Sequence, residues 1–176
     1  LLEKFPLKLM LCSSCFHSQL SIVVKPEILF KNYLYVSGTS KTLTKYFEWF
    51  VDEFIPKYMK NPTNVLEIAC NDCSLLDIFH NKGWDTYGVD PAENIFKLTK
   101  NKPHTLICNY WNYNTSKKIK QIKNNFDLIV AQNVFAHLND IHNFLKGCKN
   151  IMNNNSLLFI QTSQKNMFYN YEFDTI

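Results

Sequence analysis

The chain has 176 residues, enough for one domain with a small appendage, and its 46% hydrophobic and 15% aromatic content excludes a disordered protein. The formal net charge of +4 is too small and too dispersed to indicate a nucleic-acid partner, and no apolar run is long enough to cross a membrane. Six cysteines without a secretory signal predict a cytoplasmic location.

Residues 1–40 are the first of two regions that the sequence distinguishes. The pair Cys12-Ser-Ser-Cys15 lies between two short apolar stretches, 7–10 and 20–24, which we expect to be strands. This order is that of half a zinc ribbon, so Cys12 and Cys15 are candidate zinc ligands. Because zinc needs four ligands, we expect a first CxxC pair upstream of Leu1, where the chain also lacks an initiator Met. The alternative is a pair of buried free thiols.

Residues 41–176 alternate predicted helices and strands. Ser40 or Thr39 can cap a helix over 41–58, which has an apolar face. The predicted elements that follow are strand 65–69, a helix from Ser74, strand 86–89, helix 92–100, strand 105–108, strand 126–131, a helix from Asn139 or Asp140 to 152, and strand 156–162. The basic run 117–120 indicates a solvated helix or loop. This alternation predicts a parallel sheet covered on both faces, with strand order 3-2-1-4-5.

The segment 65–90 predicts a nucleoside-binding unit. A buried strand leads into the polar loop Cys70-Asn-Asp-Cys73 and a helix, and the next strand ends on Asp90. The loop and the helix N-terminus can approach polar groups of a ligand, and an acid at the tip of the second strand accepts hydrogen bonds from ribose hydroxyls. No residue from Ala69 to Cys73 is glycine, which argues against a dinucleotide pyrophosphate site. The alternatives are a crossover without a ligand or a redox-active CxxC pair.

The run Glu67-Ile-Ala-Cys-Asn-Asp-Cys73 resembles motif I of class I S-adenosylmethionine (SAM) methyltransferases, E/D-x-G-x-G-x-G, and more closely its variant E-I-x-S-N-D-G-x-L-L. The resemblance implies SAM as the cofactor. Because SAM has no phosphate, the loop needs fewer exposed backbone amides and tolerates Ala69. Cys73 replaces the last glycine of the motif, so we expect its side chain where the cofactor lies close.

Further motifs resemble those of zinc-binding, SAM-dependent C-methyltransferases that act on nucleotide-linked deoxysugars. In chain order they are Pro6-Leu-Lys-Leu9, Cys12-x-x-Cys15, Val24-Lys-Pro-Glu-Ile-Leu-Phe30, Tyr33-x-Tyr35-x-Ser37-x-Thr39-Ser40, Glu67 to Asp72, Gly88-Val-Asp-Pro-Ala92, Asn133-Val-Phe-Ala-His137 and Phe173-Asp-Thr-Ile176. In that family the F-D-T-I run is followed by Y-H-E-H, whose His resembles a general base, and by a substrate domain. Neither is present here, and a complete methyltransferase sheet has two more strands. The resemblance therefore implies an incomplete Rossmann-like domain that is inactive by itself.

The same resemblance implies roles for individual residues. Glu67, Asn71 and Asp72 are expected around the amino-acid end of SAM, with Ala69 and Cys73 in the same loop. Asp90 is expected at the ribose. The remaining cofactor contacts implied are Asn109, Tyr110 and Trp111 near the adenine, and Gln132 and Asn133 closing the pocket from the fourth strand. His137 is implied as donor to an enolate oxygen or as proton relay, and Tyr35 as a pocket wall that binds the sugar.

Roles without a catalytic function remain open for both catalytic candidates: His137 as a solvent-facing residue at a helix start, and Tyr35 as a packing residue. Two other functions also remain open, namely a methyltransferase that acts on oxygen or nitrogen of another small molecule, and a non-catalytic SAM-binding or interaction module. The sequence gives no indication of the oligomeric state.

Overall fold

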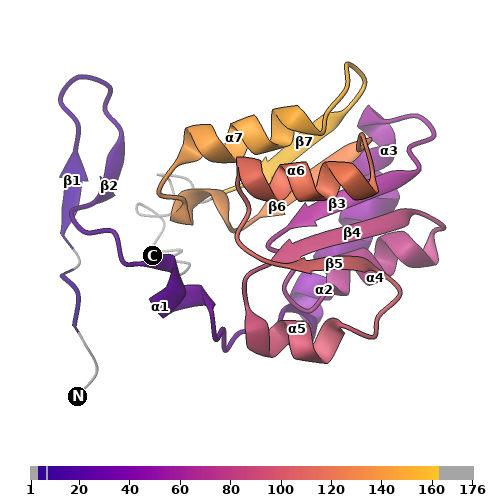
Figure 1. Cartoon of the computed structure of the whole chain (residues 1–176), viewed down its shortest axis with the longest axis horizontal. Coiled ribbons are helices and arrows are strands. Elements are labelled where there is room, and N and C mark those ends of the chain that lie inside the picture. Colours follow the sequence, from indigo (N-terminus) through magenta and orange to yellow (C-terminus); the bar gives the residue numbers. More distant parts are fainter. Residues whose placement is uncertain (1–3, 7, 163–176) are drawn as a thin grey trace.

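A computed structural model describes residues 4–6 and 8–162 (Figure 1). The predicted run 173–176 and Leu7 lie outside these residues. Among the described residues, no helix is long and apolar enough to span a bilayer.

The N-terminal region contains a small hairpin and a short helix. Strands β1 (Leu9–Leu11) and β2 (Ser18–Leu20) pair antiparallel, and helix α1 (Pro26–Phe30) follows. The second strand was predicted over 20–24 and begins earlier. The reason is the turn: Phe16 has a left-handed backbone (φ 58°), and Cys12 N donates to His17 O at 2.9 Å, so the chain reverses immediately after the CxxC pair.

The predicted helix over 41–58 is confirmed in extent but has three parts. Helix α2 (Lys41–Trp49) is capped by Ser40, whose side chain accepts a hydrogen bond from Leu43 N. A π-helical turn, η2 (Phe50–Phe54), and helix α3 (Ile55–Tyr58) continue it. The π turn was not predicted. The apolar face seen in the sequence packs into the core, where Phe50 is fully buried.

Five parallel strands form the central sheet: β3 (Asn64–Ile68), β4 (Asp85–Asp90), β5 (Thr105–Cys108), β6 (Leu128–Gln132) and β7 (Leu157–Gln161). Their order, β5-β4-β3-β6-β7, is the predicted 3-2-1-4-5. The strand order reverses at β3, which pairs with β4 on one side and with β6 on the other. In such sheets ligands bind at the carboxyl ends beside the reversal.

Helices cover both faces of the sheet (Figure 1). Helix α4 (Ser74–Asn81) and the α2–α3 helix pack with Val65, Leu128 and Val130 on one face. Helices α6 (Tyr113–Ile122) and α7 (Ile141–Asn150) cover the other face, over Leu66 and Ile129. Helix α5 (Glu93–Thr99) connects β4 with β5, and the short turns η1 (Ser37–Thr39) and η3 (Phe135–His137) complete the elements.

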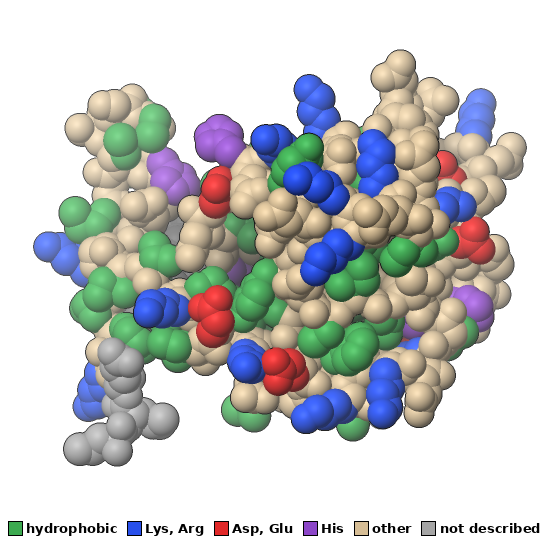
Figure 2. Space-filling model, viewed as in Figure 1, with side chains coloured by type: hydrophobic (Ala, Val, Ile, Leu, Met, Phe, Trp, Pro, Cys, Tyr) green, Lys and Arg blue, Asp and Glu red, His purple; other side chains and the backbone are tan. Residues whose placement is uncertain are grey.

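The basic run 117–120 lies on helix α6. Asn112 caps this helix by accepting a hydrogen bond from Thr115 N at 3.0 Å, and Ile119 is fully buried beneath it. The lysines of the run point outward. Figure 2 shows lysines spread over this face of the molecule without gathering into one patch.

Candidate functional site

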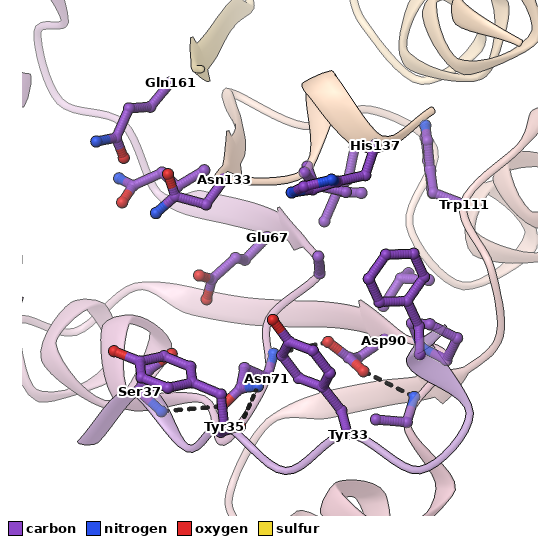
Figure 3. A pocket seen from close by; sticks show the side chains of 18 of the residues that line it. Tyr33, Tyr35, Ser37, Glu67, Asn71, Asp90, Trp111, Asn133, His137 and Gln161 are labelled. Carbon is purple, nitrogen blue, oxygen red and sulfur yellow. Dashed lines mark hydrogen bonds between the residues drawn. The ribbon is translucent and has the colours of Figure 1, made fainter. Parts of the chain in front are cut away.

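A cavity of about 710 Å³ lies at the carboxyl edge of the sheet. The ends of β3, β4, β6 and β7 form its floor, helix α2 and turn η3 contribute walls, and the segment between α1 and α2 crosses its mouth (Figure 3). Ten of the predicted site residues line it: Tyr35, Glu67, Ala69, Asn71, Asp90, Tyr110, Trp111, Gln132, Asn133 and His137.

The loop after β3 has three left-handed residues at alternate positions. Ala69, Asn71 and Cys73 have φ values of 61°, 47° and 66°. These are the three positions at which the methyltransferase motif carries glycine, the residue that adopts this conformation at least cost. The loop of this chain therefore keeps the backbone shape of the motif without its glycines, and Asn tolerates the shape better than Ala or Cys does.

Asp90 is held at the tip of β4 by two backbone amides. Asn71 N donates to one carboxylate oxygen at 2.9 Å, and Ala92 N donates to the other at 2.8 Å. Burial raises the pKa of Asp90, and these two hydrogen bonds oppose that rise. Each oxygen keeps a further lone pair, and Asp90 lines the cavity, which suits a ligand with two adjacent hydroxyls.

Glu67 is a buried carboxyl group on the cavity floor. Its side chain is 6% exposed, and Oε2 has no hydrogen-bond partner among the described residues. Burial raises the pKa of Glu67 well above its ordinary value, and the nearby acidic groups of Cys73, Asp72 and Asp90 add to the effect. A buried polar atom without a partner is costly, so Glu67 is suited to receive a donor group from a ligand.

Neighbouring strands place further unpaired polar atoms beside Glu67. Gln132 and Gln161 are register partners at the ends of β6 and β7. Both amide atoms of Gln132, Oε1 of Gln161 and the Tyr110 hydroxyl are buried without a partner in the described part of the chain. Burial also raises the pKa of Tyr110. Glu67, Gln132 and Gln161 lie near the ends of three adjacent strands and make a polar floor that a ligand with several hydroxyl or amine groups can satisfy, whereas the Tyr110 hydroxyl lies beyond the end of β5.

Aromatic rings line the opposite wall and the mouth. Tyr33 and Tyr35 come from the crossing segment and reach toward the cavity (Figure 3). The rings of Phe30 and His137 lie 5.9 Å apart, so helix α1 meets turn η3 at one side of the opening. Trp111 lines the cavity with its Nε1 bonded to Phe144 O at 3.2 Å.

Three predicted cofactor residues do not line the cavity. Asp72 accepts hydrogen bonds from Gly38 N and Ser74 N, so its carboxylate stabilises the loop and does not line the cavity. Asn109 continues the ladder between β5 and β4, its N donating to Asp90 O at 3.1 Å. Cys73 is fully buried in the core beside Cys70. Its side chain therefore points into the core and not, as the motif suggested, toward the cofactor.

Sequence reasoning did not assign functions to Tyr33, Ser37, Asn94 or Gln161. Tyr33 and Tyr35 are two positions apart, and both line the cavity. Gln161 is the last residue of an apolar strand, at the edge of the sheet that borders the cavity. The bonds of Asn94 to a segment 61 residues away left no trace in the sequence.

The CxxC pair of the hairpin has the chemistry of a metal ligand pair. Cys12 and Cys15 are exposed free thiols on one turn. Backbone hydrogen bonds from Cys15 and Ser14 lower the pKa of Cys12, which favours the thiolate that binds zinc. In the described ranges, no group of three or more His, Cys, Asp or Glu residues is arranged to hold a metal ion, so these residues fit half of a zinc site.

The sheet order, the cavity at its reversal and the acid at the tip of the second strand define a Rossmann-like fold of the class I methyltransferase type. The chain belongs to the methyltransferase domain family, whose model matches residues 41–175.

Individual relatives agree with this assignment. The C-methyltransferase NovU of Streptomyces niveus is 26% identical over 98% of this chain and 41% of its own length. A ubiquinone biosynthesis O-methyltransferase of Rhodopseudomonas palustris is 30% identical over 58% of this chain and 40% of its own length. The chain thus spans about two fifths of the length of these curated relatives.

Solved structures share the fold. The plantazolicin methyltransferase BpumL, in complex with a pentazolic desmethylPZN analog and SAH, superposes with a TM-score of 0.61 at 16% identity, over 80% of this chain and 55% of its own. The PH0226 protein of Pyrococcus horikoshii OT3 has a TM-score of 0.63 at 16% identity, over 85% of this chain and 68% of its own.

Proposed function

We propose that this chain is the cofactor-binding part of a SAM-dependent methyltransferase that methylates a carbon of a nucleotide-linked keto-deoxysugar. The observation that carries the proposal is the Asp90 carboxylate, which two backbone amides hold at the edge of a large cavity in a methyltransferase fold. The similarity to a C-methyltransferase over 98% of the chain supports the transfer to carbon.

The cavity residues fit SAM. Asp90 would hold the ribose hydroxyls, and the neutralising partner for the buried Glu67 carboxyl would be the amino group of the methionine part. Tyr110 and Trp111 would flank the adenine. Bound SAM supplies an electrophilic methyl group on a sulfonium.

The residues on the acceptor side would stabilise a carbanion. A carbon beside a ketone loses a proton more readily when a donor holds the enolate oxygen. His137 lines the cavity from η3 and would donate to that oxygen or relay the proton. Tyr35 would contact the sugar, and the unpaired amide of Gln132 and the unpaired Oε1 of Gln161 would bond its hydroxyl groups.

A test separates carbon from oxygen or nitrogen transfer. The full-length gene product is incubated in D₂O with a nucleotide-linked 4-keto deoxysugar, with and without SAM carrying a ¹³C-labelled methyl group. We expect exchange of the proton beside the ketone without SAM, and a new carbon-bound methyl signal with SAM. An oxygen-bound methyl signal, with no exchange of the proton beside the ketone, would instead favour the O-methyltransferase alternative suggested by the second relative. SAM binding without transfer to any acceptor would favour a non-catalytic module.

For the hairpin we propose that Cys12 and Cys15 supply two thiolates to a zinc site in the full-length protein. The lowered pKa of Cys12 and the shared turn support it. Zinc content measured by mass spectrometry should fall when Cys12 is replaced by Ser and stay unchanged when the buried Cys148 is replaced.

A further inference from the structure

Residues 31–37, here called the strap, cross the mouth of the cavity between helix α1 and turn η1 (Figure 3). Two asparagine side chains of the Rossmann-like domain hold the strap by its backbone. They are Asn94, on helix α5, and Asn71, in the loop after β3.

Asn94 bonds both backbone polar groups of one strap residue, Tyr33. Its Oδ1 accepts a hydrogen bond from Tyr33 N at 2.9 Å, and its Nδ2 donates to Tyr33 O at 2.7 Å. Next to it, Glu93 N donates to Lys31 O at 2.9 Å. This part of the strap is therefore tied to the start of helix α5, directly after the short loop that follows Asp90.

Asn71 holds the other end in the same manner. Its Oδ1 accepts a hydrogen bond from Ser37 N, and its Nδ2 donates to Tyr35 O, each at 3.0 Å. Both polar atoms of this side chain are thereby engaged by the strap. Asn71 faces the cofactor site through its backbone, because its N donates to Asp90 Oδ2 at 2.9 Å.

The two anchors meet at Asp90. One carboxylate oxygen bonds the backbone of Asn71, and the other bonds Ala92 N, two residues before Asn94. The strap is bonded through its backbone, and the side chains of Tyr33 and Tyr35 line the cavity. The Asp90 carboxylate is therefore linked through Asn71 to the backbone of Tyr35. It is linked through Ala92 and Asn94 to the backbone of Tyr33. Tyr33 and Tyr35 together are here called the acceptor wall.

We propose that Asn71 and Asn94 are positioning residues that couple occupancy of the cofactor site at Asp90 to the placement of Tyr33 and Tyr35. A ligand that bonds Asp90 restricts the loops on either side of it. Because the side-chain amides of Asn71 and Asn94 bond the strap, the strap is then restricted as well. The acceptor wall is then better ordered once the cofactor is bound, so the acceptor should bind more tightly to the cofactor-bound protein. This inference rests on the proposed function, since it requires a nucleoside at Asp90.

The test uses SAH, calorimetry and hydrogen exchange of backbone amides on the 176-residue chain. In the wild type we expect SAH to slow exchange of residues 33–37 by about tenfold, within the usual range of coupling between sites. In Asn94→Ala and in Asn71→Gly, SAH should still bind but slow exchange of the strap by less than about twofold. Glycine is chosen at position 71 because it keeps the left-handed backbone there.

Asn114→Ala is the matched control. Asn114 is the second residue of helix α6, as Asn94 is of helix α5, and it is exposed. This variant should respond to SAH as the wild type does. If calorimetry shows SAH binding while strap exchange is unchanged in the wild type, or is slowed equally in both anchor variants, the coupling is wrong and the cofactor assignment stands. If the wild type binds no SAH, the proposed function fails, and the coupling fails with it.

Discussion

Asn71 donates its backbone amide to the Asp90 carboxylate at 2.9 Å, so a loop residue that follows the first strand of the domain fixes the acid that ends the second. The two residues are 19 positions apart in the chain. Their contact sets the shape of the cavity at the point where the sheet reverses its strand order, and it gives the first prediction.

Asp90→Ala should weaken SAH binding by about 1.5–3 kcal/mol, because it removes charged hydrogen bonds to the ribose. Asp90→Asn keeps one acceptor oxygen and should lose less. Calorimetry measures both, and thermal unfolding checks that the loop survives. Asp85→Ala, at the other end of the same strand, is the control and should bind as the wild type does. Equal affinity of Asp90→Ala and wild type would contradict the ribose assignment.

Glu67 should make the protein less stable as the pH rises. Burial raises the pKa of Glu67 in the folded state, whereas in the unfolded chain it ionises near its ordinary value of about 4.3. The folded state therefore holds a proton that the unfolded state has lost. The stability that this provides is complete below the unfolded pKa and declines as the pH rises toward the folded pKa.

Glu67→Gln should remove that decline. Its free energy of unfolding should exceed that of the wild type by about 1.4 kcal/mol for each pH unit within this window. Urea unfolding at a series of pH values measures it. The control is Glu48→Gln, at an exposed position of helix α2. Parallel curves for Glu67→Gln and the wild type would show that Glu67 ionises normally in the folded protein.

Ala69→Gly should stabilise the protein or leave its stability unchanged, although the same change usually destabilises. The left-handed backbone at Ala69 (φ 61°) costs about 1–2 kcal/mol for a residue with a Cβ, and glycine avoids this cost. Glycine also loses more chain entropy on folding than alanine does, which destabilises the variant by about 0.5–1 kcal/mol and offsets part of the gain. Ala136→Gly, in the exposed turn η3, should destabilise by the latter amount. Similar losses in the two variants, measured by chemical unfolding, would contradict strain at Ala69.

Cys73→Gly should leave SAH affinity within about threefold of wild type, since no ligand contact is removed. The side chain of Cys73 is buried in the core and does not line the cavity. Calorimetry tests this prediction. A large loss of affinity with an unchanged unfolding midpoint would show that the thiol itself takes part in binding.

The elements and their order followed from local patterns in the sequence. Apolar runs such as 65–69 and 126–131 predicted buried parallel strands, and the capping pairs at 39–40 and 139–140 predicted helix starts, because these signals act over a few residues. The strand order 3-2-1-4-5 followed from the handedness of crossovers, which is nearly invariant. Where a signal is weak, the prediction is less definite: the basic run 117–120 is compatible with a helix or a loop.

The site was predicted in part, for the same reason. Residues placed at strand ends, such as Asp90, Glu67 and Gln132, line the cavity because a parallel sheet brings its carboxyl ends to one edge. Cys73 was misplaced because its left-handed backbone turns the side chain into the core, and a motif position does not report the direction of a side chain.

The sequence by itself determined the fold class, the course of the chain through the sheet and the acid at the tip of the second strand, since each depends on short-range periodicity and on general rules of chain connection. Only the tertiary structure decided that Asn71 and Asn94 hold the strap, and that Glu67, Gln132 and Gln161 share one polar floor. These relationships join residues dozens of positions apart. They arise from packing and hydrogen-bond geometry, which leave no periodic mark on the sequence.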